Sequence, residues 1–192
     1  MFLARRPSAR EIEEFLEHSR SLPLSYDQVG IAKESPRRFN IDGASGVVGN
    51  GKRDFERAKI ALANWRHFEL GWVELFPAGA SFEPGTVVAV VVRHLGFWSL
   101  NGCRVVYVLG HYQSETNFGF AYGTLIEHVE MGEEIFEVSF APESESVVYK
   151  IRAVSKPRAA LARIGYPLAR ILQARFRRDS INALRRAIGE VD

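Results

Sequence analysis

The chain has 192 residues, the size of a single domain, and a chain of this length buries roughly 70% of the surface that it exposes when unfolded. Hydrophobic residues make up 46% and charged residues 25%, so the composition excludes a disordered or fibrous protein. The formal net charge is +2, but residues 158–189 hold eight arginines and one acid, whereas residues 1–156 hold 17 basic and 20 acidic residues. The C-terminal region is therefore basic, and the rest of the chain is mildly acidic.

The first predicted element is a helix over residues 8–20. Ser8 and Glu11 have the spacing of a capping box, in which each side chain accepts a hydrogen bond from the backbone N–H of the other residue. Apolar residues follow at helical spacing, and Pro23 lies beyond the expected end of the helix.

Residues 24–51 are predicted to be irregular, apart from a short strand at 26–29. The glycine-rich stretch 43–51 is predicted to be a loop. A second helix is predicted over 52–67, because apolar residues recur three or four positions apart and form one buried stripe. These residues are Phe55, Ala58, Ala61, Leu62 and Trp65.

Six strands are predicted next, each rich in β-branched or aromatic residues and bounded by turn residues such as Asn101-Gly102. They are Val73–Phe76, Val87–His94, Cys103–Tyr112, Phe118–Ile126, Glu134–Phe140 and Val147–Val154. Parallel neighbours need long crossover connections, and these connections are short. The strands should therefore form an antiparallel meander.

A long helical region is predicted over residues 157–189, with Pro157 at its start. Pro167 should kink or restart the helix, because proline lacks the backbone donor and collides with the preceding turn. The later apolar residues project from a different side, which predicts a second break at Asp179-Ser180. The first apolar face consists of Leu161, Ile164, Leu168, Ile171 and Leu172.

No internal repeat or linker divides the sequence, so residues 1–192 are predicted to form one α+β domain. The single cysteine, Cys103, cannot form an intramolecular disulfide, which favours a reducing compartment. Residues 1–10 are followed by acidic residues rather than an apolar stretch, so no signal peptide is expected. No segment reaches the ~20 apolar residues of a membrane span. We expect a cytoplasmic protein and leave its oligomeric state open.

Four segments together resemble one protein family. They are Gly49-Asn50-Gly51 followed by Phe55, Ala58, Ala61, Leu62, Trp65, Phe68 and Trp72; Cys103 to Val108; Phe118 to Leu125 with His128, Glu130, Gly132, Glu133, Glu134, Phe136 and Val138; and Ser155-Lys156-Pro157. On these residues the chain resembles the bacterial and plant group called domain of unknown function nineteen-ninety, an uncharacterised protein family. The resemblance brings no established activity.

The resemblance implies a helix-grip architecture, similar to the START-like superfamily of polyketide cyclases and lipid-transfer proteins. In that architecture a curved antiparallel sheet of six or seven strands wraps around the last helix, and a cavity often opens between them. The helix within residues 1–23 is an addition to this plan. The leading hypothesis is a domain that binds an apolar or amphipathic small molecule in such a cavity, without a cofactor or a metal.

The residues expected to bind this molecule come from the strands and the last helix. They are Trp98, Arg104, Tyr107, Phe120, Tyr122, Thr124 and Leu168. Large aromatic side chains either line a pocket or fill a core, and core filling is the general expectation. An inward-facing Arg104 would need a buried carboxylate such as that of Glu134 or Glu137, and we favour such a structural pair over a ligand anchor.

The second hypothesis is an enzyme of the cyclase, isomerase or hydrolase type that uses His128 and nearby carboxylates such as Glu130. On a strand these two residues project from the same face, and an imidazole beside a carboxylate can transfer protons. Turn residues are more often simply solvated, and the other histidines lack metal-ligand spacing. Cys103 lies in an apolar strand, which favours a small core residue over a nucleophile.

Gly46 to Lys52 has the G-x-x-x-x-G-K spacing of a phosphate-binding loop. Arg53, however, stands where Ser or Thr should hold magnesium, and no buried strand precedes the glycines. We favour a flexible entry to a helix over nucleotide binding, or over the binding of a simpler anion by the helix N-terminus.

The arginines of residues 158–189 suggest a third hypothesis, the binding of nucleic acid or of an anionic membrane surface. Arg163, Arg170 and Arg177 are seven residues apart and should form one solvated stripe opposite the apolar face. A nucleic-acid partner is therefore disfavoured.

Overall fold

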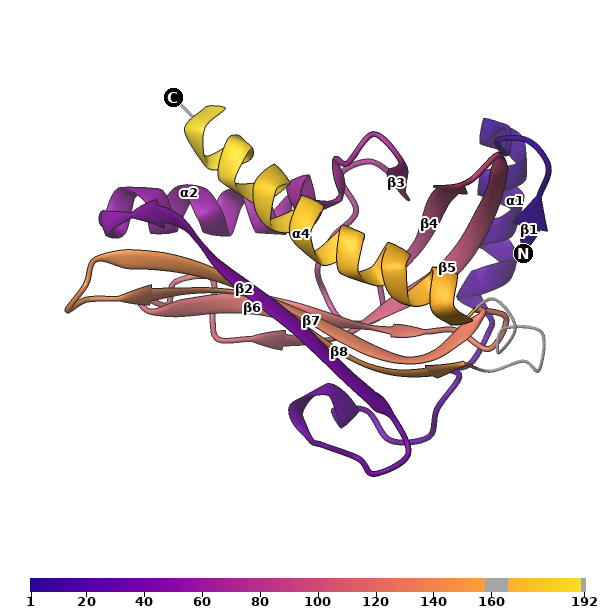
Figure 1. Cartoon of the computed structure of the whole chain (residues 1–192), viewed down its shortest axis with the longest axis horizontal. Helices are drawn as coiled ribbons and strands as arrows, with labels where there is room; N and C mark the ends of the chain where they lie inside the picture. Colours follow the sequence, from indigo (N-terminus) through magenta and orange to yellow (C-terminus); the bar gives the residue numbers. More distant parts are fainter. Residues whose placement is uncertain (158–165, 191–192) are drawn as a thin grey trace.

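An antiparallel sheet that curls beneath two helices forms the body of the protein in the computed structural model, which describes residues 1–157 and 166–190 (Figure 1). The strands are β1 (Phe2–Leu3), β2 (Asn40–Asn50), β3 (Val73–Phe76), β4 (Val87–His94), β5 (Phe97–Leu109), β6 (Asn117–Thr124), β7 (Glu130–Ala141) and β8 (Ser146–Pro157). The helices are α1 (Ala9–Arg20), α2 (Gly51–Ala63) and α4 (Tyr166–Glu190), with short 3-10 helices η1 (Ile31–Lys33) and η2 (Arg66–Phe68).

The strand order confirms the predicted meander. Strands β3 to β8 lie side by side in chain order and every pair is antiparallel. Strand β2 is added at one edge, next to β8, and β1 pairs with the first part of β5. The bounds of β3 and β4 agree with the prediction, whereas β5 begins at Phe97 rather than Cys103. The α+β, helix-grip prediction is therefore correct.

The predicted glycine-rich loop at 43–51 is wrong, because most of this stretch belongs to strand β2, which pairs with β8 along its length. Glycine usually weakens a strand, but here its lack of a side chain allows close packing. A Cβ atom on Gly46 would lie 2.9 Å from Cγ2 of Ile181, so the absent side chain leaves room for α4 to cross the strand. The short strand predicted at 26–29 is also wrong, since this segment consists of a bend followed by a turn.

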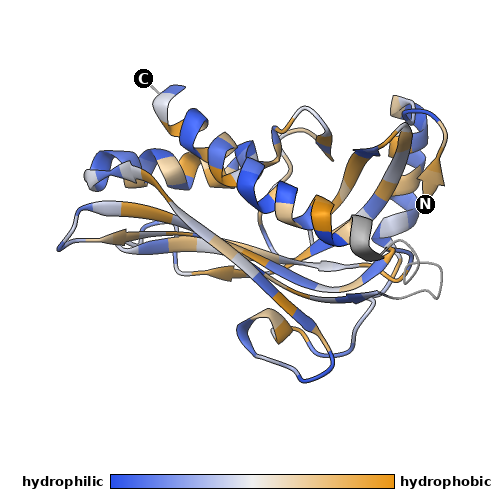
Figure 2. Ribbon diagram, in the orientation of Figure 1, coloured by the Kyte–Doolittle hydropathy of each residue, from blue (hydrophilic) through white to orange (hydrophobic). Residues whose placement is uncertain are grey.

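Helix α1 begins as predicted, with Ser8 as its N-cap and the complete Ser8–Glu11 capping box. It lies against the convex face of the sheet (Figure 1). Its apolar side, which includes Phe15, packs against Ala89 and Leu100 of β4 and β5. Helices α2 and α4 cover the opposite, concave face, and the main core lies between them and the sheet. Figure 2 shows hydrophilic and hydrophobic residues alternating along both helices, as expected for helices with one buried face.

Helix α4 runs without interruption through Asp179-Ser180, so the break predicted there is wrong. The buried stripe of this helix recurs every four residues and passes through a polar residue: it consists of Leu172, Phe176, Ser180, Leu184 and Ile188. Ser180 is fully buried, and its hydroxyl lies 3.1 Å from that of Tyr149 on β8. The apolar residues alone change sides along the helix, and the buried Ser180 makes the stripe continuous.

The start of the predicted C-terminal helical region also differs from the structure. Pro157, which we expected to open it, is the last residue of β8. The expectations for Leu161, Arg163 and Ile164 lie outside the described residues. Within the described part of the chain, no helix is both long and apolar enough to cross a membrane.

Candidate functional site

A cavity of about 520 Å³ lies between the concave face of the sheet and the first half of α4. Its walls are mainly apolar, with side chains from β4, from the segment after α2 and from α4: Phe68, Trp72, Val90, Val92, Leu172 and Phe176. Three further lining residues, Phe2, Leu95 and Phe97, are exposed to solvent and mark the opening of the cavity. A cavity of this size can hold a small organic molecule.

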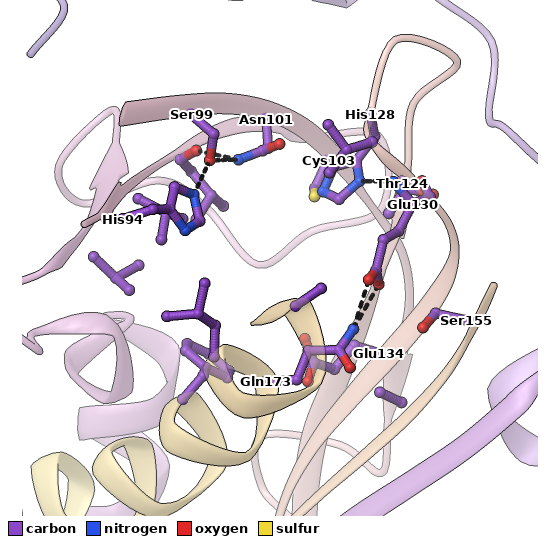
Figure 3. Close-up of a pocket in the computed structure, with 18 of the residues that line it drawn as sticks. His94, Ser99, Asn101, Cys103, Thr124, His128, Glu130, Glu134, Ser155 and Gln173 are labelled. Atoms are coloured by element: carbon purple, nitrogen blue, oxygen red, sulfur yellow. Dashed lines mark hydrogen bonds between the residues drawn. The ribbon is translucent and has the colours of Figure 1, made fainter. Parts of the chain in front are cut away.

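One end of the cavity carries a chain of hydrogen bonds on β4 and β5 (Figure 3). The amide nitrogen of Asn101 donates to the Val90 carbonyl (3.3 Å) and to Oγ of Ser99 (2.9 Å). Because that nitrogen can only donate, the Ser99 hydroxyl proton is free to donate to Nε2 of His94, 2.7 Å away. Burial lowers the pKa of His94, so its imidazole is neutral at physiological pH and can accept this bond.

The other end carries carboxyl groups from β7 and an amide from α4 (Figure 3). The Gln173 amide nitrogen donates to both carboxyl oxygens of Glu130, at 2.8 and 2.7 Å. The Tyr122 hydroxyl donates to Oε2 of Glu134 at 2.9 Å. Desolvation raises the pKa of Glu130, and raises that of Glu134 to about 7 despite the hydrogen bond from Tyr122. Glu134 therefore changes its protonation state near neutral pH.

Two arginines of α4 lie next to these carboxyl groups. Arg170 forms a bidentate ion pair with Asp42 of β2, and a guanidinium nitrogen of Arg177 lies 3.7 Å from the same carboxylate. The Arg177 side chain is only 11% exposed and lines the cavity. The solvated arginine stripe that we predicted is therefore wrong for Arg177, because Asp42 draws the side chain inward. Arg163, its third member, lies outside the described residues.

His128 lines the cavity from the turn before β7. Its Nδ1 atom lies 3.0 Å from both the backbone nitrogen and the carbonyl oxygen of Glu130. Burial lowers the pKa of His128 to about 4, so this side chain is neutral at physiological pH. His128 and Glu130 thus both line the same cavity, but backbone groups rather than the Glu130 carboxylate contact the imidazole.

Of the predicted ligand-binding residues, Tyr122 and Thr124 line the cavity. Phe120 is fully buried in the core between Trp65 and Phe136 and does not line it. Leu168 lies in the first turn of α4, but its side chain is outside the described part of the structure.

Three other predicted residues project from the convex face of the sheet, away from the cavity. Trp98 packs with the cluster beneath α1, and Arg104 donates to the carbonyls of Arg20 and Leu22 at 3.0 and 2.8 Å. Tyr107 lies on the same face because a β-bulge interrupts the alternation between Val105 and Tyr107. The structure therefore does not bring these three residues together with Tyr122 and Thr124.

The cavity also contains polar residues that were not singled out from the sequence: His94, Ser99, Asn101 and Gln173. A signal for two of them was available, because Ser99, Asn101 and Cys103 alternate along one strand and therefore share a face. Gln173 had no comparable signal, since a polar residue beside an apolar helix face is usually solvated. Cys103 is buried, and burial raises the pKa of its thiol, as expected for the predicted core residue.

The phosphate-loop pattern at Gly46 to Lys52 does not form a cradle of free amides. Strand β2 pairs with β8, and the Gly51 nitrogen donates to the carbonyl of Glu145 at 2.7 Å. Lys52 forms an ion pair with Glu115 at 3.1 Å. Among the described residues, no group of three or more His, Cys, Asp or Glu side chains could hold a metal ion.

Known structures share this architecture. A hypothetical protein from Helicobacter pylori matches with a TM-score of 0.55 at 11% identity, covering 79% of this chain and 92% of its own. The di-domain ARO/CYC protein BexL, from the BE-7585A biosynthetic pathway, matches with a TM-score of 0.51 at 13% identity, covering 82% of this chain and 52% of its own. At these identities the similarity establishes the fold alone, and it confirms the helix-grip prediction.

Sequence similarity extends over nearly the whole chain. A relative from Dictyostelium discoideum, named as a UPF0548 protein, is 30% identical over 98% of this chain and 96% of its own length. The family described as "Domain of unknown function (DUF1990)" matches residues 25–183. The chain therefore belongs to this family, as the sequence resemblance predicted.

Proposed function

We propose that the protein binds a small apolar or amphipathic molecule in the cavity between the sheet and α4. The observation that carries the proposal is the cavity itself, about 520 Å³ with mainly apolar walls and polar groups concentrated at two ends. Small-molecule sites typically combine such walls with a few polar groups that fix orientation. The fold shared with the ARO/CYC protein BexL is compatible with this function but does not by itself establish it.

The first test is native mass spectrometry of the purified protein, followed by denaturing extraction of any molecule that co-purifies. A stoichiometric apolar or amphipathic molecule supports the proposal and identifies its chemical class. Binding is then measured by titration with that molecule, using the tryptophan fluorescence, to which Trp72 in the cavity wall contributes.

A matched pair of variants tests whether the cavity is the site. Ala169 of α4 lines the cavity, whereas Ala174 of the same helix is exposed to solvent. Ala169→Phe should fill part of the cavity and weaken binding by at least about tenfold, because the ligand loses buried contact area. Ala174→Phe should leave the affinity unchanged. Equal affinity in the two variants would place the site elsewhere.

A second candidate function is acid–base catalysis on the bound molecule. Glu134 supports it better than His128, because an effective general base has a pKa near the working pH, and the value of about 7 for Glu134 meets this condition. For His128 the pKa is about 4. In such a reaction the Glu134 carboxylate removes a proton from a carbon next to a carbonyl, and the resulting enolate takes a proton back from the carboxylic acid.

This candidate is tested by exchange with deuterated water. Incubation of the protein with 2-decanone should incorporate deuterium next to the carbonyl, and NMR follows the exchange. We expect Glu134→Gln to abolish the protein-dependent exchange and Glu137→Gln, on the convex face of the same strand, to preserve it. If deuterium exchange with the wild-type protein is no faster than in buffer alone, the protein does not catalyse this reaction.

The arginine-rich helix offers less support for nucleic-acid binding, because several of its arginines contact acidic groups of the protein. Arg170 and Arg177 contact Asp42, and Arg175 and Arg178 contact Asp179. Paired arginines contribute less charge to a phosphate-binding surface.

A further inference from the structure

Among the described residues, the carboxyl-bearing end of the cavity has more acidic than basic groups. Glu130 and Glu134 of β7 and Arg177 of α4 line the cavity, and behind them Asp42 of β2 pairs with Arg170 and Arg177. With all five ionised the formal charge is −1, so one additional positive charge would neutralise this end. Tyr122 and His128 also face it, and both are uncharged at physiological pH. The Met1 ammonium, which donates to the Leu100 carbonyl, is close enough to His128 to lower the pKa of its imidazole.

The hydrogen bonds at this end leave an acceptor available to a ligand. Glu130 receives hydrogen bonds from Gln173 and from the Ser155 hydroxyl, and Glu134 receives one from Tyr122 at Oε2. No described residue donates a hydrogen bond to Oε1 of Glu134. A carboxylate has about four lone-pair positions. The two carboxyl groups can thus accept further donors from a ligand in the cavity. Arg177 lies 3.7 Å from Asp42 and also lowers the pKa of Glu134 through its charge, but it donates no hydrogen bond to that carboxyl group.

The pKa values of both glutamates are raised, although Arg170 lowers that of Glu130 and Arg177 lowers that of Glu134. Desolvation is the first cause for each, and Asp42 adds to it for both. Without a ligand, the site reduces its negative charge by retaining a proton near neutral pH. A bound cation would serve the same purpose and replace that proton.

We propose that the molecule bound in the cavity is an amphipathic amine, whose ammonium group lies at the Glu130–Glu134 end and whose apolar part extends toward the opening at Leu95 and Phe97. This inference rests on the proposed function and adds to it the chemical class of the ligand. The ammonium supplies both the missing charge and the hydrogen-bond donors. A fatty acid would instead place a third carboxylate beside the two glutamates.

Three probes with the same alkyl chain test the assignment: decylamine, decanol and decanoate. Their affinities are measured by isothermal titration calorimetry at pH 8 and pH 6, below the concentrations at which they aggregate. At pH 8 we expect decylamine to bind at least about tenfold more tightly than the other two, as for a hydrogen bond to a charged group. At pH 6 its affinity should fall, by about tenfold per pH unit at most, because binding must displace a proton.

Proton release is a second, independent readout. An alkylamine remains protonated over this range, like a lysine side chain with a pKa of about 10.4. Binding of decylamine at pH 6 should therefore release up to one proton from the carboxyl groups. Titrations in two buffers with different ionisation enthalpies measure this number, and a value of zero would overturn the inference.

Two variants locate the charge, and one serves as the control. Glu134→Gln keeps the shape of the side chain and should weaken decylamine binding by at least about tenfold, with little effect on decanol. Glu137→Gln makes the same change on the convex face of the same strand and should have no effect. If Glu134→Gln does not fold by circular dichroism, Glu130→Gln replaces it with the same expectation.

The outcomes separate this inference from the proposed function. Tight binding of decanol or decanoate without a preference for decylamine overturns the amine assignment and keeps the cavity as a binding site. A preference for decanoate would indicate that Arg177 is the anchor. Binding of none of the three probes overturns the proposed function, and the amine assignment with it.

Discussion

Glu133 and Glu134 are neighbours on β7, yet their carboxyl groups lie on opposite faces of the sheet and in opposite surroundings. On the convex face, Glu133 is 2% exposed and accepts four hydrogen bonds: from the hydroxyls of Tyr26 (2.9 Å) and Tyr107 (2.6 Å) and from the backbone nitrogens of Gly30 (2.9 Å) and Ala32 (3.2 Å). On the concave face, Glu134 accepts one, from Tyr122.

This difference separates a structural role from a chemical one. A carboxylate whose acceptor positions are filled by the protein holds its neighbours in place and has little capacity for a ligand. In this chain Glu133 attaches the segment around η1 to the back of the sheet. Glu134, with fewer partners and a cavity beside it, keeps the capacity to bind or to exchange a proton. The following predictions test this division between the two faces.

The largest effect is expected for Glu133→Ala. The change leaves two tyrosine hydroxyls and two backbone nitrogens without their acceptor, so the free energy of unfolding should fall by about 3–5 kcal/mol. Urea denaturation measures it. Glu137→Ala, on the same strand and the same face, should cost less than about 1 kcal/mol. Similar losses for the two variants would show that Glu133 is not a structural centre.

The next effect concerns His67, which lies on the concave side among Trp65, Phe68 and Phe136. His67 is fully buried, neither ring nitrogen has a hydrogen-bond partner among the described residues, and desolvation lowers its pKa to about 3. Below pH 6.5 the His67 imidazole of the unfolded chain therefore takes up a proton, whereas that of the folded protein stays neutral until the pH approaches 3. Stability contributed by the neutral imidazole is complete above that pH and is lost as the pH falls toward 3.

His67→Leu removes this dependence. We expect the gain in the free energy of unfolding over the wild type to be about 2 kcal/mol larger at pH 5 than at pH 7.5, from about 1.4 kcal/mol per pH unit. Urea denaturation at the two pH values gives both numbers. If the stability difference between the variant and the wild type is the same at both pH values, a hydrogen-bond partner outside the described residues must satisfy the imidazole.

For Glu134 the sign is reversed. Its folded pKa of about 7 lies above the ordinary value of 4.5, so the folded protein retains a proton that the unfolded chain releases. Its contribution to stability is present below pH 4.5 and is lost as the pH rises through 7. The free energy of unfolding of Glu134→Gln, relative to that of the wild type, should therefore rise by about 1–2 kcal/mol from pH 5 to pH 8, after allowance for partial solvent access. Glu137→Gln should show no such gain.

The sequence was sufficient for the antiparallel meander and for most helices, because the apolar periodicity and the turn residues act locally, whereas the helix-grip arrangement was predicted from the family resemblance. It was insufficient where one element makes room for another. In β2, glycine at position 46 makes the sequence look unlike a strand, but it is required there because α4 packs too closely for a side chain. In α4, Ser180 interrupts the apolar pattern, but it can be buried because its hydroxyl forms a hydrogen bond with that of Tyr149. Neither partner is near in sequence.

The candidate site was predicted only in part for a related reason. Alternation shows which residues of a strand share a face, but it does not show which face borders the cavity. Tyr122 and Thr124 line the cavity, and their role in ligand binding stays a prediction. Arg104 lies on the other face, and the bulge between Val105 and Tyr107 places Tyr107 there as well.

Arg104 therefore gives the smallest expected effect. Its guanidinium holds the carbonyls of Arg20 and Leu22 at the end of α1. Arg104→Ala should lower the free energy of unfolding by about 1–2 kcal/mol, since hydrogen bonds from a charged donor are lost at a partly exposed site. The affinity for decylamine should not change, because the sheet separates this side chain from the cavity. A loss of decylamine affinity in a folded Arg104→Ala variant would mean that the two faces of the sheet are coupled, whereas lost stability with full affinity would confirm that the convex face supports the fold and the concave face holds the ligand.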